Sequence, residues 1–128
     1  MSTRVLIDTS VWIEFFRRSE GALGDTVLQL LDEDRIVLCG MVELELLQGA
    51  RPREQRMLED LLGALGYVET DRQDYSDAGQ QLARLRRKGI TVPASDGLIA
   101  TLCLRHRCQL LTLDAHFDYF PAVQRLPV

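Results

Sequence analysis

The fold of this chain is decided by the stretch VLIDTSVWIEFF, residues 5–16. Its first three residues are an apolar run, which predicts a short buried strand, and its last six place large apolar side chains at helical spacing. Between the two stand Asp8, Thr9 and Ser10, of which Ser10 suits the N-cap of the helix. The stretch therefore predicts a strand that leads directly into a helix.

The same alternation of strand and helix continues along the chain. Further strands are expected at residues 36–39, 67–69, 90–92 and 109–113, with a weaker signal around 123–126. Helices are expected around Val27 to Leu31, at about 41–48, between Pro52 and Gly66, at 71–88 and at 95–105. The strands are continuous apolar runs, as parallel strands buried on both faces are. The class is therefore α/β, with a mostly parallel sheet and helices on both faces.

Length and composition describe an ordinary globular protein. The 128 residues allow one domain, residues 1–128, and are too few for two. No apolar stretch is long enough to span a bilayer, and residues 1–4 do not resemble a secretion signal, so we expect a cytoplasmic protein. The three cysteines form no CxxC pair, which favours buried, reduced thiols.

The net charge of −4 argues against binding nucleic acid by bulk attraction. Basic residues nevertheless gather in several short groups, among them Arg17-Arg18 and Arg84 to Lys88. An acidic metal pocket with basic flanks would give the same total charge. The alternative is that these groups are solvated helix faces, which is the simpler interpretation for most of them.

Three acids fall where a parallel sheet places its ligands, beyond the carboxyl ends of the strands. Asp8 follows the first strand, Asp114 follows the strand that ends at residue 113, and Asp96 stands a few residues past Val92, at the start of a helix. Together they would form a cage of hard oxygen ligands suited to Mg²⁺ or Mn²⁺. Each acid alone could instead be a helix cap or a turn residue. Crowded carboxylates repel one another unless a cation is present, which weakens that alternative for the group.

A fourth acid is harder to choose from the pattern. On a helical wheel of residues 41–49, Glu45 lies between Met41 and Val42, and Glu43 lies nearer the opposite face. Apolar residues nearly surround this short helix, so the preference for Glu45 is slight and both acids remain candidates.

Four segments of the chain resemble, in order, the signature of PIN-domain proteins, and above all the VapC-type toxins of bacterial toxin–antitoxin pairs. The segments are LIDTSVW at 6–12, ELLQG at 45–49, DGLIA at 96–100 and LTLDAHF at 111–117. The resemblance implies a PIN-like three-layer α/β sandwich. It also implies a Mg²⁺- or Mn²⁺-dependent endoribonuclease that cuts structured RNA of the tRNA or rRNA class and is inhibited by a cognate antitoxin.

The resemblance also assigns residues. The catalytic and metal-binding acids it implies are Asp8, Glu45, Asp96 and Asp114, which selects Glu45 over Glu43. Hydroxyl groups that support the site match Thr9, Ser10 and Thr112. One position departs from some relatives, which carry a further acid two residues after the fourth where this chain has His116. The number of bound metals, one or two, is therefore open.

Partners follow from the resemblance and from the apolar content of two helices. Relatives of this type form homodimers and bind an antitoxin across the active-site groove. The helices after the first two strands carry more large apolar residues than one buried face needs, so we expect some to be exposed. The expected antitoxin contact involves Trp12, Phe16 and the acid cluster. The alternative is that two layers of core absorb all of these apolar residues.

Other functions that begin with an acid after a first strand fit less well. A phosphoaspartate phosphatase typically has a second Asp two residues on, where this chain has Ser10. A receiver domain needs its Asp after a central strand, and residues 69–71 are a poor candidate. The remaining alternative is a PIN-fold module that binds RNA or a partner without cutting.

Overall fold

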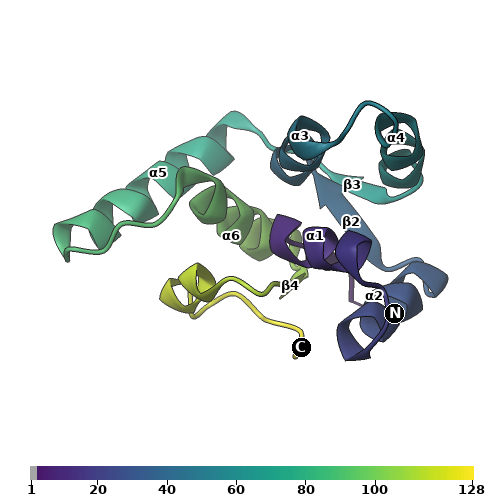
Figure 1. Ribbon diagram of the computed structural model, residues 1–128. Coiled ribbons are helices and arrows are strands. Elements are labelled where there is room, and N and C mark those ends of the chain that lie inside the picture. The colour runs from purple at the N-terminus through teal and green to yellow at the C-terminus, as the bar shows by residue number, and fades with distance from the viewer. Residues whose placement is uncertain (1–2) are drawn as a thin grey trace.

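The computed structural model describes residues 3–128, and its centre is a four-stranded sheet. The strands are β1 (Val5–Ile7), β2 (Ile36–Cys39), β3 (Gly66–Val68) and β4 (Gln109–Leu111), in the order β3-β2-β1-β4 (Figure 1). Each pair of neighbouring strands is parallel. The predicted parallel sheet is therefore confirmed.

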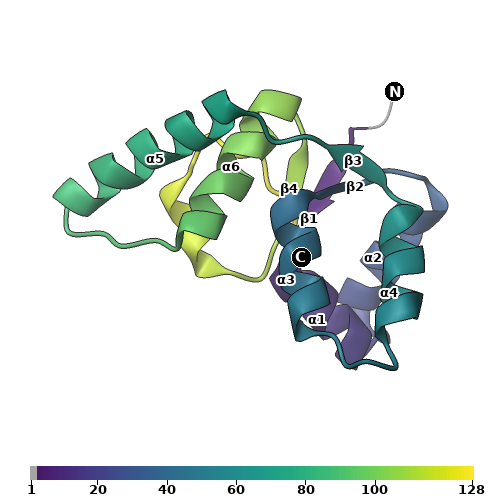
Figure 2. The ribbon, with the colours of Figure 1, turned by 90° about the horizontal axis from the view of Figure 1, so that it is seen from above.

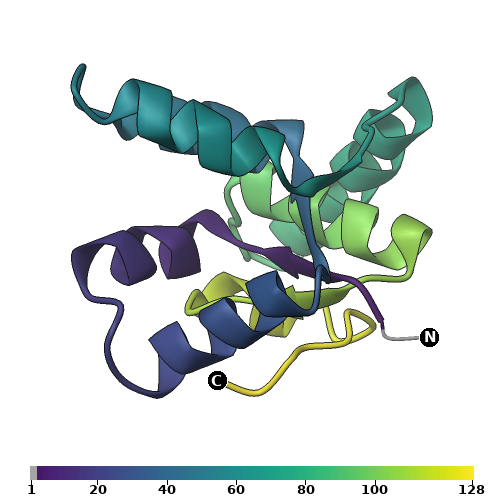
Figure 3. The ribbon, with the colours of Figure 1, turned by 90° about the vertical axis from the view of Figure 1, so that its right-hand side faces the viewer.

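Helices fill every connection between the strands. They are α1 (Thr9–Arg17), α2 (Ala22–Asp32), α3 (Gly40–Gly49), α4 (Gln55–Gly63), α5 (Arg72–Arg87) and α6 (Ala94–His106), with a 3-10 helix η1 (Ala115–Tyr119) after β4. The path from β1 through β2 to β3 runs one way along the sheet, and the path to β4 runs back. Right-handed crossovers then place α1 to α4 on one face and α5 and α6 on the other. Figures 2 and 3 show this division, which confirms the predicted α/β class.

The core is built around β1, which lies between β2 and β4. Leu6 pairs with Val37 on one side and with Leu110 on the other. All three residues of β1 are buried, because helices cover both faces of the sheet. This explains why the strand is a continuous apolar run instead of an alternating one.

Two contacts fix α6 against α5. A Cβ atom at Gly97 would come within 2.8 Å of the Leu82 side chain, so the helices approach this closely only because residue 97 is glycine. Asp74 of α5 is fully buried and accepts hydrogen bonds from Nε (2.6 Å) and a terminal nitrogen (2.8 Å) of Arg105. A buried carboxylate needs such a partner. These contacts set the position of the helix that carries Asp96.

Some local predictions are wrong. Residues 90–92 form no strand and instead lead into α6, and β4 ends at Leu111 instead of residue 113. The weak signal near 123–126 gives only a bridge, between Leu110 and Arg125. Ser10 is not the N-cap of α1, because the helix begins at Thr9 and Asp8 holds the cap position.

Two other expectations can be compared directly. Cys39, Cys103 and Cys108 are free and buried, as predicted. Within residues 3–128, no helix combines the length and apolar character needed to cross a membrane.

Candidate functional site

The candidate site lies at the point where the strand order reverses. The connection leaving β1 crosses toward β2, while β4 joins the opposite side of β1. Ligands of open parallel sheets bind beyond the carboxyl ends of the strands at such a switch point. Asp8 follows β1 there, and its backbone N–H donates to the carbonyl of Leu111 at the end of β4 (2.9 Å). The two strand ends are thus bonded together where the acids emerge.

Hydroxyl groups hold Asp8 in a fixed orientation. Its Oδ2 accepts hydrogen bonds from Ser10 Oγ (2.7 Å) and from Thr112 Oγ1 (2.8 Å). Thr112 Oγ1 accepts the backbone N–H of Asp114 (2.9 Å), and Ser10 Oγ accepts that of Leu113 (3.1 Å). The hydroxyl that was predicted to cap α1 therefore connects Asp8 to the loop after β4.

Asp96, Asp114 and His116 form a close group. Nδ1 of His116 lies 3.1 Å from Asp96 Oδ2 and 3.0 Å from Asp114 Oδ1. One donor atom from each of the three residues lies within 4.8 Å of the others. Asp96 comes from the first turn of α6, and the other two come from the segment after β4. Residues twenty positions apart are thus brought to one point.

Glu45 contacts the residue next to Asp8. Its Oε1 accepts a hydrogen bond from Thr9 Oγ1 (2.8 Å), the residue that directly follows Asp8. Glu43 faces a different neighbour, since its charge contributes to a raised pKa of Tyr67, after burial, which is the larger cause. Of the two acids of α3, the structure therefore connects Glu45 to the Asp8 segment.

The charges of the site act on one another. Burial, followed by the negative charges of Asp114 and Asp8, raises the pKa of Asp96 to about 6 against the opposing effect of His116. Burial also raises the pKa of the Cys39 thiol, and backbone N–H groups oppose this while the charges of Asp8 and Glu45 add to it. Asp8 and Glu45 lie outside the close group, but the charge of Asp8 reaches Asp96.

This raised pKa predicts how the stability of the metal-free protein depends on pH. The folded-state pKa of Asp96 lies above its ordinary value of 3.8, so folding takes up a proton between about pH 4 and pH 6. The contribution of Asp96 to stability therefore falls as pH rises through that window, by about 3 kcal/mol. Urea unfolding in EDTA should show Asp96→Asn gaining stability over the parent at pH 7 and little at pH 4. Equal differences at both pH values would contradict this.

The donor chemistry of the site fits a divalent cation. Two carboxylates and an imidazole approach one another, the charge of Asp8 acts on Asp96 from a third chain segment, and the repulsion among the carboxylates is what a cation would relieve. Oxygen-rich groups of this kind suit Mg²⁺ and Mn²⁺. The residues present therefore fit the metal that the sequence predicted.

An apolar groove begins beside Glu45. It lies between α1, α3 and α4, and its walls include Phe16, Met57 and Leu58, with Glu45 and Arg51 also lining it. Phe16 of α1 is 41% exposed and Leu44 of α3 is 56% exposed. The expectation that some apolar residues of these helices are exposed is confirmed.

The predicted antitoxin contact of Trp12 is wrong. Trp12 is 0% exposed and stacks on Phe16, with ring centroids 5.7 Å apart. A side chain without exposed area cannot contact a partner on this surface, so Trp12 belongs to the core and supports Phe16 from below.

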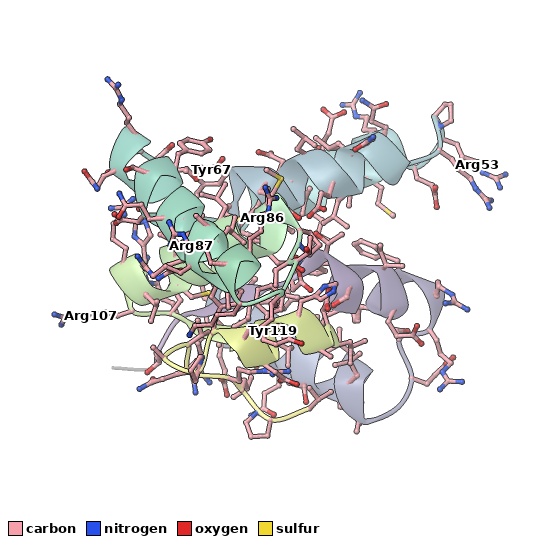
Figure 4. The ribbon with its side chains drawn as sticks, turned by 90° about the vertical axis from the view of Figure 1, so that its left-hand side faces the viewer. Arg53, Tyr67, Arg86, Arg87, Arg107 and Tyr119 are labelled. Atoms are coloured by element: carbon pink, nitrogen blue, oxygen red, sulfur yellow. The ribbon has the colours of Figure 1, made fainter. Side chains whose placement is uncertain are left out.

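The basic side chains are dispersed. Figure 4 shows Arg53 in the connection before α4 and Arg107 after α6 extending outward at opposite ends of the molecule, with Arg86 and Arg87 on α5. All four are exposed. The interpretation as solvated charges fits these residues better than a single basic flank around the acids.

Comparison with known proteins identifies the family. Residues 5–123 match the PIN domain, and the chain belongs to the PIN-domain family. Within that family it is 35% identical to VapC ribonuclease Mb1587 of Mycobacterium bovis and to ribonuclease VapC11 of Mycobacterium tuberculosis, with 95% of each chain covered. The fold matches the crystal structure of DNA-bound VapBC from Salmonella typhimurium with a TM-score of 0.82 and 21% identity, over 98% of both chains. The resemblance drawn from the four segments is confirmed.

His116 was not predicted from the sequence as a residue of the site. His116 was noted only because it replaces an acid of some relatives, yet it is the residue that touches both Asp96 and Asp114. The spacing of His116 could have indicated this contact. When Asp114 caps a short helix, its side chain accepts the backbone N–H of the residue two positions later, which brings that residue close to Asp114.

Proposed function

We propose that this protein is a Mg²⁺- or Mn²⁺-dependent endoribonuclease, the toxin of a toxin–antitoxin pair, acting in the cytoplasm as a single domain. The observation that carries the proposal is the convergence of Asp8, Asp96 and Asp114 at the switch point of the sheet. The VapC ribonucleases it resembles support the same activity. The proposed substrate is structured RNA of the tRNA or rRNA class.

The proposed chemistry is hydrolysis of a phosphodiester bond. A bound divalent ion would activate water and neutralise charge on the phosphate. Asp8 and Asp96, the most buried of the four site acids, would bind it directly, with Asp8 oriented by Ser10 and Thr112. Asp114 and Glu45 are less buried, and they would complete the ligand set or orient the attacking water. Thr9 would keep Glu45 facing the site.

A pair of variants in α3 tests the proposal. Glu45→Gln should reduce RNA cleavage by about 100-fold, because it removes a charge from the site, whereas Glu43→Gln should keep most activity. Both acids are partly buried on the same helix, so the second is a matched control. Cleavage of a defined structured RNA would be measured with Mg²⁺, Mn²⁺ or EDTA. Cleavage that persists in EDTA would contradict the proposed metal dependence. RNA binding without any cleavage would indicate a binding module instead of an enzyme.

The proposed partner is a cognate antitoxin that occupies the groove between α1, α3 and α4. The groove offers exposed apolar side chains next to a carboxylate, which suits an apolar segment followed by an arginine. We also propose a homodimer, for which light scattering would measure twice the mass of 14.5 kDa.

The antitoxin contact predicts a difference between two exposed apolar residues. Phe16→Ala should weaken antitoxin binding by about 10-fold or more, because it removes an aromatic contact from the groove. Leu28→Ala is the control, since Leu28 is 50% exposed on α2 and does not line the groove. Calorimetric titration of each variant would measure the affinities. If both variants bind the antitoxin as the parent does, the groove is not the contact surface.

A further inference from the structure

A histidine lies within the candidate metal site. His116 stands two positions after Asp114, and its ring Nδ1 lies 3.1 Å from a carboxylate oxygen of Asp96 and 3.0 Å from one of Asp114. We propose that His116 is itself a metal ligand, through Nδ1, and that it gives the site a preference for Mn²⁺ over Mg²⁺. This inference rests on the proposed metal-dependent function.

The distances agree with ligands of one ion. Two donors at right angles on an octahedral ion, with bonds of about 2.1 Å, lie about 3 Å apart. Nδ1 of His116 lies 3.1 Å from the Asp96 oxygen and 3.0 Å from the Asp114 oxygen. These two separations match adjacent ligands of one octahedral ion, and the three donor atoms all lie within 4.8 Å of one another.

The backbone fixes the histidine in this position. The N–H of His116 donates to Asp114 Oδ1 (2.9 Å), in the cap of η1. The next residue, Phe117, is buried in the core and anchors the same turn. The ring itself is 45% exposed, so an ion can reach it from solvent. A ligand held by its own backbone and by a buried neighbour loses little conformational freedom on binding.

The nitrogen ligand is the reason for the proposed preference for Mn²⁺ over Mg²⁺. Mg²⁺ is bound by oxygen and dehydrates reluctantly, whereas nitrogen ligands favour transition ions. A site of carboxylates alone would accept Mg²⁺ and Mn²⁺ similarly, and one imidazole shifts it toward Mn²⁺. Replacing the ring by a carboxylate should remove that shift.

Electron paramagnetic resonance of the Mn²⁺-loaded protein tests the inference. The pulsed spectrum should show coupling to a directly bound ¹⁴N nucleus, and the coupling should vanish in His116→Gln and His116→Asp. His106→Gln is a matched control, because the chain has two histidines and His106 lies at the other end of α6, beside the Glu69 carbonyl. It should keep the coupling. His116→Asp should also reduce the ratio of Mn²⁺ to Mg²⁺ affinity by about tenfold.

The outcomes separate this inference from the proposed function. Mn²⁺ that binds the parent protein without nitrogen coupling would leave the metal site standing and overturn His116 as a ligand. An affinity ratio unchanged in His116→Asp would overturn the preference. No binding of Mn²⁺ at millimolar concentration would overturn both the metal-dependent function and the inference. Circular dichroism in EDTA confirms that each variant is folded.

Discussion

Asp8→Asn should reduce RNA cleavage by about 100-fold or more while leaving the fold intact. Oδ2 of Asp8 is occupied by the hydroxyls of Ser10 and Thr112, and the amide oxygen of Asn can accept both hydrogen bonds. The substitution therefore removes the negative charge without removing the contacts that connect the ends of β1 and β4. In the proposed mechanism, loss of one carboxylate weakens the binding of the divalent ion and so reduces the stabilisation of the transition state.

Cleavage rates under saturating Mn²⁺ and unfolding in EDTA would be measured on the same preparations. Asp60→Asn is the control, because Asp60 is an exposed acid of α4 outside the site. It should keep the parent's rate. If Asp8→Asn also keeps that rate, the acid cluster is not the active site, whatever the family relationship.

Trp12→Ala should destabilise the protein by about 3–5 kcal/mol. Trp12 is fully buried, stacks on Phe16 and meets the edge of Phe15 with centroids 6.1 Å apart. Removing the indole leaves a cavity beneath α1, the helix that starts immediately after Asp8. Domains of this size have a total stability of about 5–15 kcal/mol, so a measurable unfolded fraction at 37 °C is expected.

Urea unfolding of Phe16→Ala provides the comparison. Phe16 keeps 41% of its area exposed, so its truncation should cost about 1 kcal/mol. Equal losses for the two variants would mean that the core does not distinguish these neighbouring rings. Antitoxin binding by Trp12→Ala should decrease only in proportion to the fraction of the variant that is unfolded.

The regular elements were predictable because each carries a local signal. The apolar runs at 5–7 and 36–39 are strands because helices cover both faces of the sheet, and Gly89, with φ of 81°, ends α5 where the sequence placed its stop. The strand predicted at residues 90–92 does not form, and the reason is local. They are β-prone, but Pro93 follows immediately, and the chain enters α6 without reaching the sheet.

Some residues of the candidate site can be placed from the sequence, and others only from the folded structure. Asp8 and Asp114 could be placed from sequence because each follows a strand. Asp96 was placed near them by an argument from residues 90–92 that the structure does not support. It reaches the site because α6 is fixed against α5 through Gly97 and Asp74. The contacts of His116 depend on a turn two residues long, which no periodic pattern reports.

The pairing of β1 with β4 determines when the site can exist during synthesis. Val5 pairs with Gln109, and Leu110 in turn bonds to the backbone of Gln124 and Leu126. The ribosome completes the first strand long before the last, and pairing of such distant segments closes late. Asp8 therefore waits without Asp96 or Asp114 through most of translation. The site therefore cannot be complete until the C-terminal segment that bonds to β4 has been synthesised.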